Sequence, residues 1–283
     1  MNPMMTTIRS GARRGVIEFK QSFFTAQDLL GLLIPNTILI VVMIFMRGST
    51  VGTTGFSLGT MSLSSVLGMT VAFSGMMTVM QHLTIEREDG TLLRAKAIPN
   101  GMLGYLVGKV VVVSALSVVG LLMILIPGLF LFDGLAFDTV GSWLTFIWVL
   151  VLGLIATMPI GAVLGSMFSN PRNSGLMSLP VMGLVAISGI FVPLTQMPDW
   201  LQPIGQIFPI YWLGLGMRSA LLPDELVVVE IGQSWRHLET VGVLGAWALA
   251  GVLLAPIVLR RMARRESGST LAERREKALQ RTT

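Results

Sequence analysis

The residues with the clearest capacity for chemistry form one charged segment between two long apolar stretches. From Glu86 to Pro99 the sequence reads EREDGTLLRAKAIP, which holds six charged residues. Carboxylates held this densely at a membrane surface suit recognition of a basic groove on a soluble partner, because opposite charges steer and orient protein contacts. The segment therefore predicts a docking site made of Glu86, Glu88, Asp89, Gly90, Thr91, Leu92 and Leu93.

The same segment predicts a short surface helix. Gly90 breaks the backbone, Thr91 suits the cap of the helix that follows, and Pro99 ends it. Acidic residues at the N-terminal edge of such a helix are favoured by its dipole.

The sequence lacks the usual motif for binding a nucleotide. The nearest approach to the phosphate-binding pattern GxxxxGK[ST] is Gly104, Gly108, Lys109 and Val110, which is one residue short and has no hydroxyl. We therefore predict that this chain is not an enzyme and binds no cofactor of its own.

Acid–base and metal chemistry are equally poorly supported. The chain has two histidines, His82 and His237, and we expect neither to have an acidic partner at the spacing of metal ligands. The absence of cysteine excludes disulfides, thiolate ligands and a cysteine nucleophile. No catalytic or metal-binding residue is predicted, and His82 is expected to be an interfacial side chain with satisfied hydrogen bonds.

The elements that must position the charged segment are transmembrane helices. Hydrophobic residues make up 53% of the chain and charged residues 12%, which a soluble domain of this length would not show. Runs of roughly 17 to 26 residues without Asp, Glu, Lys or Arg are long enough to cover a hydrocarbon core of about 30 Å. Six such runs predict an all-α membrane protein: Leu29–Met46, Leu58–Met80, Val110–Phe132, Trp143–Phe168, Leu176–Val192 and Val241–Leu259.

The basic residues predict the orientation of these helices. With both termini inside, 17 of the 20 basic residues fall on the inner side, and Arg47, Arg218 and Arg236 fall outside. We predict a multi-pass protein of the inner (plasma) membrane with cytoplasmic N- and C-termini and without a cleaved signal peptide. This bias and the attraction to anionic lipids account for the net charge of +5, so no nucleic-acid partner is expected.

The first 28 residues predict an interfacial helix that contacts membrane lipids. Apolar side chains recur at spacings of four, four, three and four residues, and Arg9, Arg13 and Lys20 flank them, where they can reach lipid phosphates. The stripe consists of Ile8, Ala12, Val16, Phe19 and Phe23, and the opposite face carries Ser10, Arg14, Glu18 and Ser22. The alternative is a soluble helix packed on a partner.

Polar side chains in the first two spans suggest a translocation path. In the second span Thr70, Ser74 and Thr78 share one face with His82 at a spacing of four residues, and methionines lie close by. The predicted path consists of Asn36, beside the helix-kinking Pro35, with Met69, Thr70, Ser74, Met77 and Thr78. The alternative is that these hydroxyls only join helices, as they commonly do in membranes.

The predicted domain organisation has three parts. Residues 1–28 form the cytoplasmic interfacial helix, residues 29–259 the six-helix domain, and residues 260–283 a cytoplasmic tail. Within the domain, residues 83–104 form an inner loop. Residues 193–222 contain four prolines among many aromatic side chains, which predicts short re-entrant helices before the last span, a seventh span being the alternative.

Two segments resemble signatures of one protein family. The first comprises Glu86, Glu88, Gly90, Thr91, Leu92, Ile98, Pro99, Tyr105, Gly108 and Lys109. The second comprises Phe191, Pro193, Met197, Pro198, Trp200, Leu201, Ile204 and Pro209, with Arg218 beyond it. Together they resemble the ABC-2 type permeases, the membrane subunits of ATP-binding cassette exporters, and are similar to permeases of the daunorubicin-resistance type.

This resemblance implies a six-helix permease that forms a homodimer or pairs with a paralogue. It also implies two copies of a separate ATPase, which hold ATP and Mg²⁺, and an amphipathic small molecule, drug or lipid-like substrate. In that family the inner loop and the interfacial helix contact the ATPase, and the cavity lies between two permeases. Two departures, at Lys96 and Asn100, occupy positions where the family varies.

Two other classes of function stay open. A secondary efflux carrier would need a protonatable group, for which His82 is the candidate. A membrane scaffold without transport would explain the docking segment, but not the kinked helices lined with glycine and serine.

Overall fold

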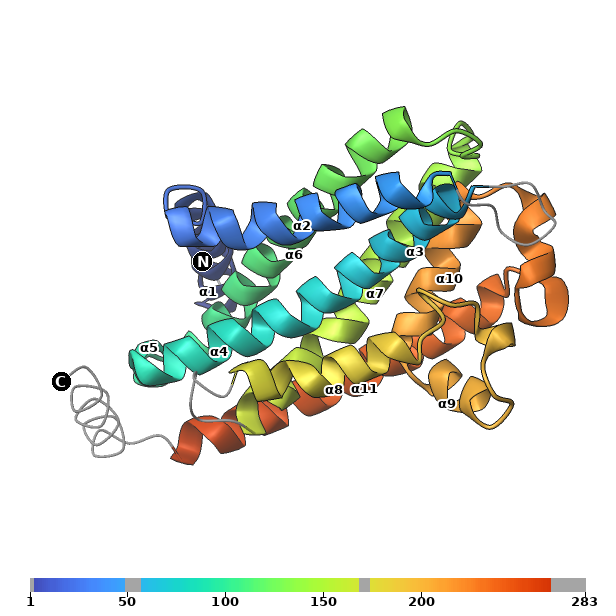
Figure 1. Ribbon diagram of the computed structural model, residues 1–283. Coiled ribbons are helices and arrows are strands. Elements are labelled where there is room, and N and C mark those ends of the chain that lie inside the picture. Colours follow the sequence, from blue (N-terminus) through green and yellow to red (C-terminus); the bar gives the residue numbers. More distant parts are fainter. Residues whose placement is uncertain (1–2, 49–56, 168–173, 266–283) are drawn as a thin grey trace.

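The computed structural model describes residues 3–48, 57–167 and 174–265, and every element within these ranges is helical (Figure 1). This confirms the predicted all-α class. The predicted tail, residues 260–283, lies mostly outside the described residues.

Five helices in the described ranges are long and apolar enough to cross a membrane. They lie alongside one another as a bundle (Figure 1). Their order is α2 (Ala26–Met46), the continuous stretch α3 (Leu58–Phe73), η1 (Ser74–Thr78) and α4 (Val79–Glu88), then α6 (Gly101–Leu131), α7 (Val140–Met167) and α11 (His237–Arg265).

The fifth predicted span, Leu176–Val192, differs from the helix that the structure shows there. Helix α8 (Ser174–Ala186) has 13 residues, which at 1.5 Å per residue cover about 20 Å. The chain then turns at Gly189, whose φ is +72°, so the apolar residues up to Val192 do not extend the helix. Hydrophobicity alone therefore misplaced this helix end.

The bundle has two ends, which we name after short helices. At the α5 end, Leu259 near the end of α11 packs in one cluster with Leu83 of α4 and Leu92 of α5 (Thr91–Lys96). Helix α1 (Pro3–Gln21) also lies at this end (Figure 1). At the α10 end, Arg47 forms an ion pair with Asp133, with 3.0 Å between Nη2 and Oδ2.

The proline-rich segment forms short helices, as expected, but one of them lies inside the bundle. The helices are η3 (Leu194–Gln196), α9 (Leu201–Ile207) and α10 (Pro209–Leu221), followed by η4 (Asp224–Val229) and η5 (Ile231–Gln233). Helix α10 lies against α3 and α7, and all but one of its residues are buried. Small residues allow this close packing: a Cβ atom on Gly68 of α3 would overlap the backbone of Gly214.

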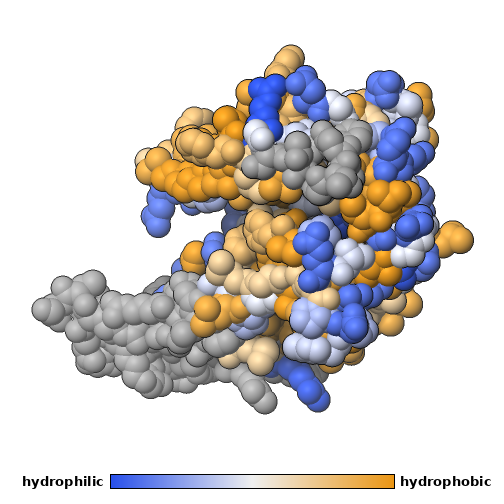
Figure 2. All heavy atoms as spheres, turned by 45° about the vertical axis from the view of Figure 1, so that its right-hand side comes forward, coloured by the Kyte–Doolittle hydropathy of each residue, from blue (hydrophilic) through white to orange (hydrophobic). Residues whose placement is uncertain are grey.

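The outer surface of the bundle is strongly apolar. Along α2 only Asn36 and Met43 are buried, while side chains such as Ile34, Ile38 and Phe45 are exposed. Figure 2 shows broad apolar areas between polar ones on one face of the molecule. Exposed apolar surface of this extent marks contact with lipid or with another protein.

Candidate functional site

The docking segment has the predicted local structure. Helix α4 ends at Glu88, and Gly90 takes the left-handed conformation, with φ of 79°, before α5 begins. Asp89 accepts a hydrogen bond from the backbone N–H of Thr91, with 2.7 Å between Oδ1 and N. The cap of α5 is therefore made by Asp89 and Gly90, and not by Thr91 as expected.

The predicted docking residues divide between surface and interior. Glu86, Gly90, Thr91 and Leu92 are buried, Glu88 and Leu93 are half-buried, and Asp89 is exposed. Three residues outside the predicted set, Arg94, Lys96 and Ile98, are also exposed. The surface of this segment is therefore mixed in charge. Whether it binds a partner stays a prediction.

The carboxylate of Glu86 is buried and pairs with groups of its own chain, so a role of Glu86 in docking stays a prediction. Its Oε1 lies 2.6 Å from Nζ of Lys109, and its Oε2 accepts a hydrogen bond of 2.7 Å from the hydroxyl of Tyr105. Lys109 also pairs with Glu18 of α1. The Nδ1 of His82 lies 3.3 Å from Oε1 of Glu18 and 3.2 Å from Nζ of Lys109. We call these five residues the Lys109 node.

Glycines on two helices bring the node together. A Cβ atom on Gly11 or on Gly15 of α1 would overlap the backbone of Gly104 or of Gly108 of α6, respectively. Small residues four positions apart on both helices permit this close approach of two backbones. Glu18 lies about one helical turn beyond Gly15, and Lys109 follows Gly108, so the two charged groups meet.

Helix α1 therefore packs on the chain through Gly11, Gly15 and the half-buried Glu18, whereas Ser10 and Arg14 of the predicted polar face are exposed. Of the predicted apolar stripe, Ile8, Val16 and Phe23 are exposed and Phe19 is half-buried, and the flanking Arg13 is exposed. The stripe thus remains available for lipid, and its contact with a membrane stays a prediction.

The node also corrects the expectation for His82. Glu18, His82 and Glu86 each place a possible ligand atom within 4.8 Å of the others, an arrangement that can hold a metal ion. The ammonium of Lys109 pairs with both carboxylates, so the cluster has a cation of its own. Sequence spacing did not reveal this arrangement because Glu18 comes from another helix.

The charges of the node depend on one another. Burial alone would raise the pKa of Glu18, but hydrogen bonds and charge interactions with His82 and Lys109 outweigh it and lower the pKa to about 2. The node brings the ammonium of Lys109 between the carboxylates of Glu18 and Glu86. Opposite charges therefore stabilise the contact of α1 with the rest of the chain.

The predicted path residues lie between helices. Asn36 donates a hydrogen bond of 2.8 Å to the carbonyl oxygen of Leu32, and the hydroxyls of Ser74 and Ser117 lie 2.6 Å apart. Thr70 donates to a carbonyl of its own helix, Met77 is buried, and Met69 and Thr78 are half-buried. Of these bonds only the one between Ser74 and Ser117 joins two helices, as the alternative expects, and the path itself stays a prediction.

An unexpected π-helix, η1, includes three of the predicted path residues, Ser74, Met77 and Thr78. A Cβ atom on Gly161 of α7 would overlap the carbonyl of Met76, so α7 packs closely against this turn. Such single turns are frequent at functional sites.

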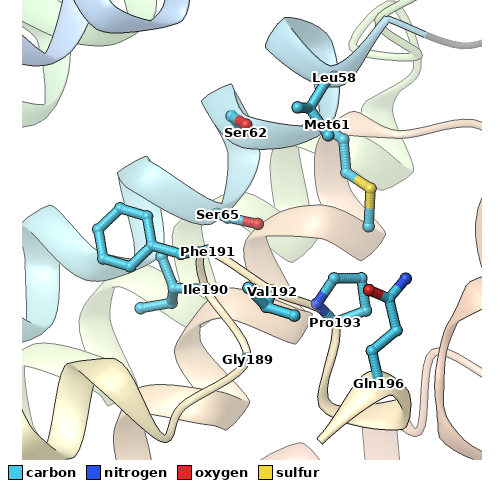
Figure 3. A pocket seen from close by; sticks show the side chains of 10 residues that line it. All are labelled: Leu58, Met61, Ser62, Ser65, Gly189, Ile190, Phe191, Val192, Pro193 and Gln196. Carbon is cyan, nitrogen blue, oxygen red and sulfur yellow. The ribbon is translucent and has the colours of Figure 1, made fainter. Parts of the chain in front are cut away.

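Sequence reasoning also missed an ion pair and a pocket at the α10 end. Arg218 binds Glu230 through two hydrogen bonds, of 2.6 Å from Nε and 3.2 Å from Nη2, and Nη1 donates to Ser65 at 3.1 Å. Ser65 also lines a pocket of about 190 Å³ between α3 and residues 189–196, where Met61 and Gln196 lie on opposite sides (Figure 3).

Comparison with known proteins places this architecture in a family. The sequence profile described as "ABC-2 family transporter protein" matches residues 49–257, well over half of the chain. The chain belongs to the ABC-2 transporter family. This confirms the resemblance drawn from the two signature segments, and the ABC-2 match together with five apolar helices indicates a multi-pass membrane protein.

A bacterial relative supports the assignment to the ABC-2 family. The chain is 27% identical over 158 residues to the "Putative transport permease YvfS" of Bacillus subtilis (strain 168), a match that covers 55% of this chain and 61% of that protein. The chain thus spans less than two thirds of that relative's length. ABC-2 permeases are non-catalytic membrane subunits of transporters, and they generally work with a separate ATPase subunit.

Proposed function

We propose that this chain is the membrane subunit of an ATP-driven exporter that moves an amphipathic small molecule, drug or lipid-like substrate out of the cytoplasm. ATP and Mg²⁺ are bound and used by a separate ATPase subunit. The observation that carries the proposal is the segment from Asp89 to Ile98, in which the charged side chains of Asp89, Arg94 and Lys96 are exposed. It joins two apolar helices at the end of the bundle where α1 and the end of α11 also lie.

The path of the chain supports six crossings. Helix α7 ends at the α5 end, where Arg87 donates to the carbonyl of Ser166 at 3.4 Å. Gly189 to Val192 lie at the opposite end, against Leu58 and Met61 at the start of α3. The chain therefore runs the length of the bundle between α7 and residue 189, partly as α8. A sixth crossing through this short helix, with α10 as a re-entrant element, would place both termini on one side.

The distribution of charge supports a cytoplasmic position for that side. Helix α1 and the segment from Glu86 to Pro99 carry seven basic residues, and Lys109 of α6 is an eighth at this end. The described residues of the α10 end carry Arg47, Arg218 and Arg236. Basic residues near membrane-spanning helices favour the cytoplasm.

Assembly with a second permease would complete the substrate path. Helix α2 exposes most of its apolar length, and Asn36 is the polar residue buried along it. A second copy or a paralogue covering such a face would enclose a cavity between two subunits, which suits an amphipathic substrate.

Reconstitution tests the proposal. The full chain, co-expressed with a candidate ABC ATPase subunit, should retain that ATPase through purification. In proteoliposomes the complex should move a cationic amphipathic dye such as ethidium only when ATP and Mg²⁺ are supplied. Loss of the ATPase from the wild-type complex, or transport that does not depend on ATP, would count against the proposal.

A proton-coupled carrier is the second candidate, and the Lys109 node is what favours it. His82 lies beside two carboxylates and an ammonium, an arrangement of ionisable groups that proton carriers use. Transport driven by a pH gradient in vesicles without ATP, and lost in a His82→Gln variant, would select this candidate.

A further inference from the structure

The segment formed by α4 and α5, residues 79–96, is attached to the bundle in two different ways. Toward α7 and α11 the attachment is apolar, through a cluster of Leu83, Leu92, Ala95, Ala162 and Leu259. Toward α1 and α6 it is ionic, through the Lys109 node. One side therefore depends on packing and the other on charge.

Lys109 takes part in both contacts of the ionic attachment. Its ammonium contacts Glu18 of α1 and Glu86 of α4, and its own backbone belongs to α6. Without Lys109, two carboxylates from different helices would face each other with little water around them, and they would repel. The side chain of Lys109 is 9% exposed and that of Glu86 is 10% exposed, so solvent screens this interaction weakly.

The node lies directly before the segment from Asp89 to Ile98. Glu86 is in the last turn of α4, and only Asp89 and Gly90 separate that helix from α5. A displacement of α5 would therefore act on Glu86 through a short and well-ordered connection. From Glu86 it would pass through Lys109 to α6 and α1.

The glycine contacts show why the ionic link matters for α1. Gly11 and Gly15 bring the backbone of α1 against α6, but they present no side chain that would fix its position along that helix. Glu18, together with His82 and Lys109, provides a directional contact there.

We propose that Lys109 is a positioning residue for energy coupling. It holds α1, the segment α4–α5 and the neighbouring half of α6 as one unit, so that a movement imposed on α5 by the ATPase reaches the transmembrane helices. This inference rests on the proposed function, but its structural part can be tested without an ATPase.

Spin-label distances test the structural part. Because the chain has no cysteine, labels can be placed at Ile17→Cys on α1 and Ala97→Cys after α5, both exposed positions. In Lys109→Met the distance distribution between them should become about twice as broad, since the directional link is lost. Lys109→Arg, which keeps the charge, should retain a narrow distribution.

Two controls separate positioning from general loss of structure. A second label pair, at Ala97→Cys and Arg261→Cys, spans the apolar attachment and should not change in Lys109→Met. Lys20→Met makes the same substitution at an exposed lysine of α1 and should leave both distances unchanged. An unchanged distance between positions 17 and 97 in Lys109→Met would overturn the proposal, and so would equal broadening of both pairs. If Lys109→Met cannot be purified, Glu86→Gln gives the same test.

Coupling is tested in proteoliposomes that contain the ATPase. Lys109→Met should retain the ATPase and its ATP hydrolysis, while the amount of ethidium moved per ATP falls about tenfold, as a misplaced element reduces an otherwise intact process. Lys109→Arg should recover most of this ratio. An unchanged ratio in Lys109→Met would overturn the proposal. If the wild-type chain binds no ATPase, the proposed function fails, whereas the label distances still decide whether Lys109 positions α1.

Discussion

The two ends of the bundle each contain a buried basic residue paired with glutamate, but the two pairs are built differently. At the α10 end, Arg218 is 2% exposed and binds the single carboxylate of Glu230, which is 6% exposed, through two parallel hydrogen bonds. At the α5 end, Lys109 divides its ammonium between Glu86 and Glu18, and the latter is 24% exposed.

This difference shows how the side chain of the cation suits its task. A guanidinium matches one carboxylate with a fixed planar fork, whereas an ammonium can serve partners in several directions. The Arg218 pair closes on itself and joins α10, the loop at Glu230 and Ser65 of α3. The Lys109 node has partners on several helices and links α1, α4 and α6. The first arrangement suits a rigid core and the second suits a joint.

Removal of Arg218 should have the largest effect on stability. Arg218→Met leaves the carboxylate of Glu230 buried without a partner, which should lower the free energy of unfolding by about 3 to 5 kcal/mol. Thermal unfolding of the purified protein in detergent measures this. The double variant Arg218→Met/Glu230→Met should recover more than half of the loss. If Arg218→Met unfolds at the wild-type temperature, the contrast between the two ends is lost.

A larger side chain between α1 and α6 should have the next largest effect. Gly15→Val would force the backbones of the two helices apart, at a cost of about 1 to 3 kcal/mol, and should detach α1 while the rest of the bundle remains folded. Faster tryptic cleavage at Arg13 and Arg14, compared with wild type, would report the detachment. Gly31→Val is the matched control, because a Cβ atom there meets no neighbour within 4 Å.

Acid should weaken the α5 end through Glu18. Its pKa is lowered from 4.5 to about 2 in the folded protein, so its stabilising contribution is complete above pH 4.5 and is lost as the pH falls toward 2. The distance between labels at positions 17 and 97 should therefore stay constant from pH 8 to pH 5, by this linkage, and broaden at about pH 3. In Glu18→Gln the distribution should not change over the acid range. Broadening in that variant with the same midpoint would assign the effect to another group.

Charge reversal on the exposed part of the segment should have the smallest effect on stability. Asp89 is exposed, and its change to Arg should alter the free energy of unfolding by less than about 1 kcal/mol, most of it from the lost cap of α5. The same change should reduce retention of the ATPase in co-purification, because charged groups at an interface orient the partner. Asp199→Arg, also exposed but at the α10 end, is the control. Equal retention of the ATPase by both variants would show that the segment around Asp89 is not part of the interface.

Much of the helical framework could be predicted because it depends on local properties of the chain. Apolar runs long enough to cross a bilayer are continuous in sequence, and they became α2, the stretch α3–α4, α6, α7 and α11. Gly90 likewise marked the break before α5, since a left-handed backbone conformation favours glycine whatever its neighbours are. The end of α8 was missed because its apolar residues continue beyond the turn at Gly189.

The sequence by itself thus determined an all-helical membrane protein with a short helix between two long ones and a family signature around it. Only the tertiary structure decided which groups of that signature are exposed and which are buried against the chain. Glu18, Glu86 and Lys109 come from three separate helices, and charges interact according to their distance in space, which sequence spacing does not report. One signal was nevertheless present, because Gly11 and Gly15 share their spacing with Gly104 and Gly108. Paired small residues of this kind let two helices approach closely, and here that approach brings the charges of the node together.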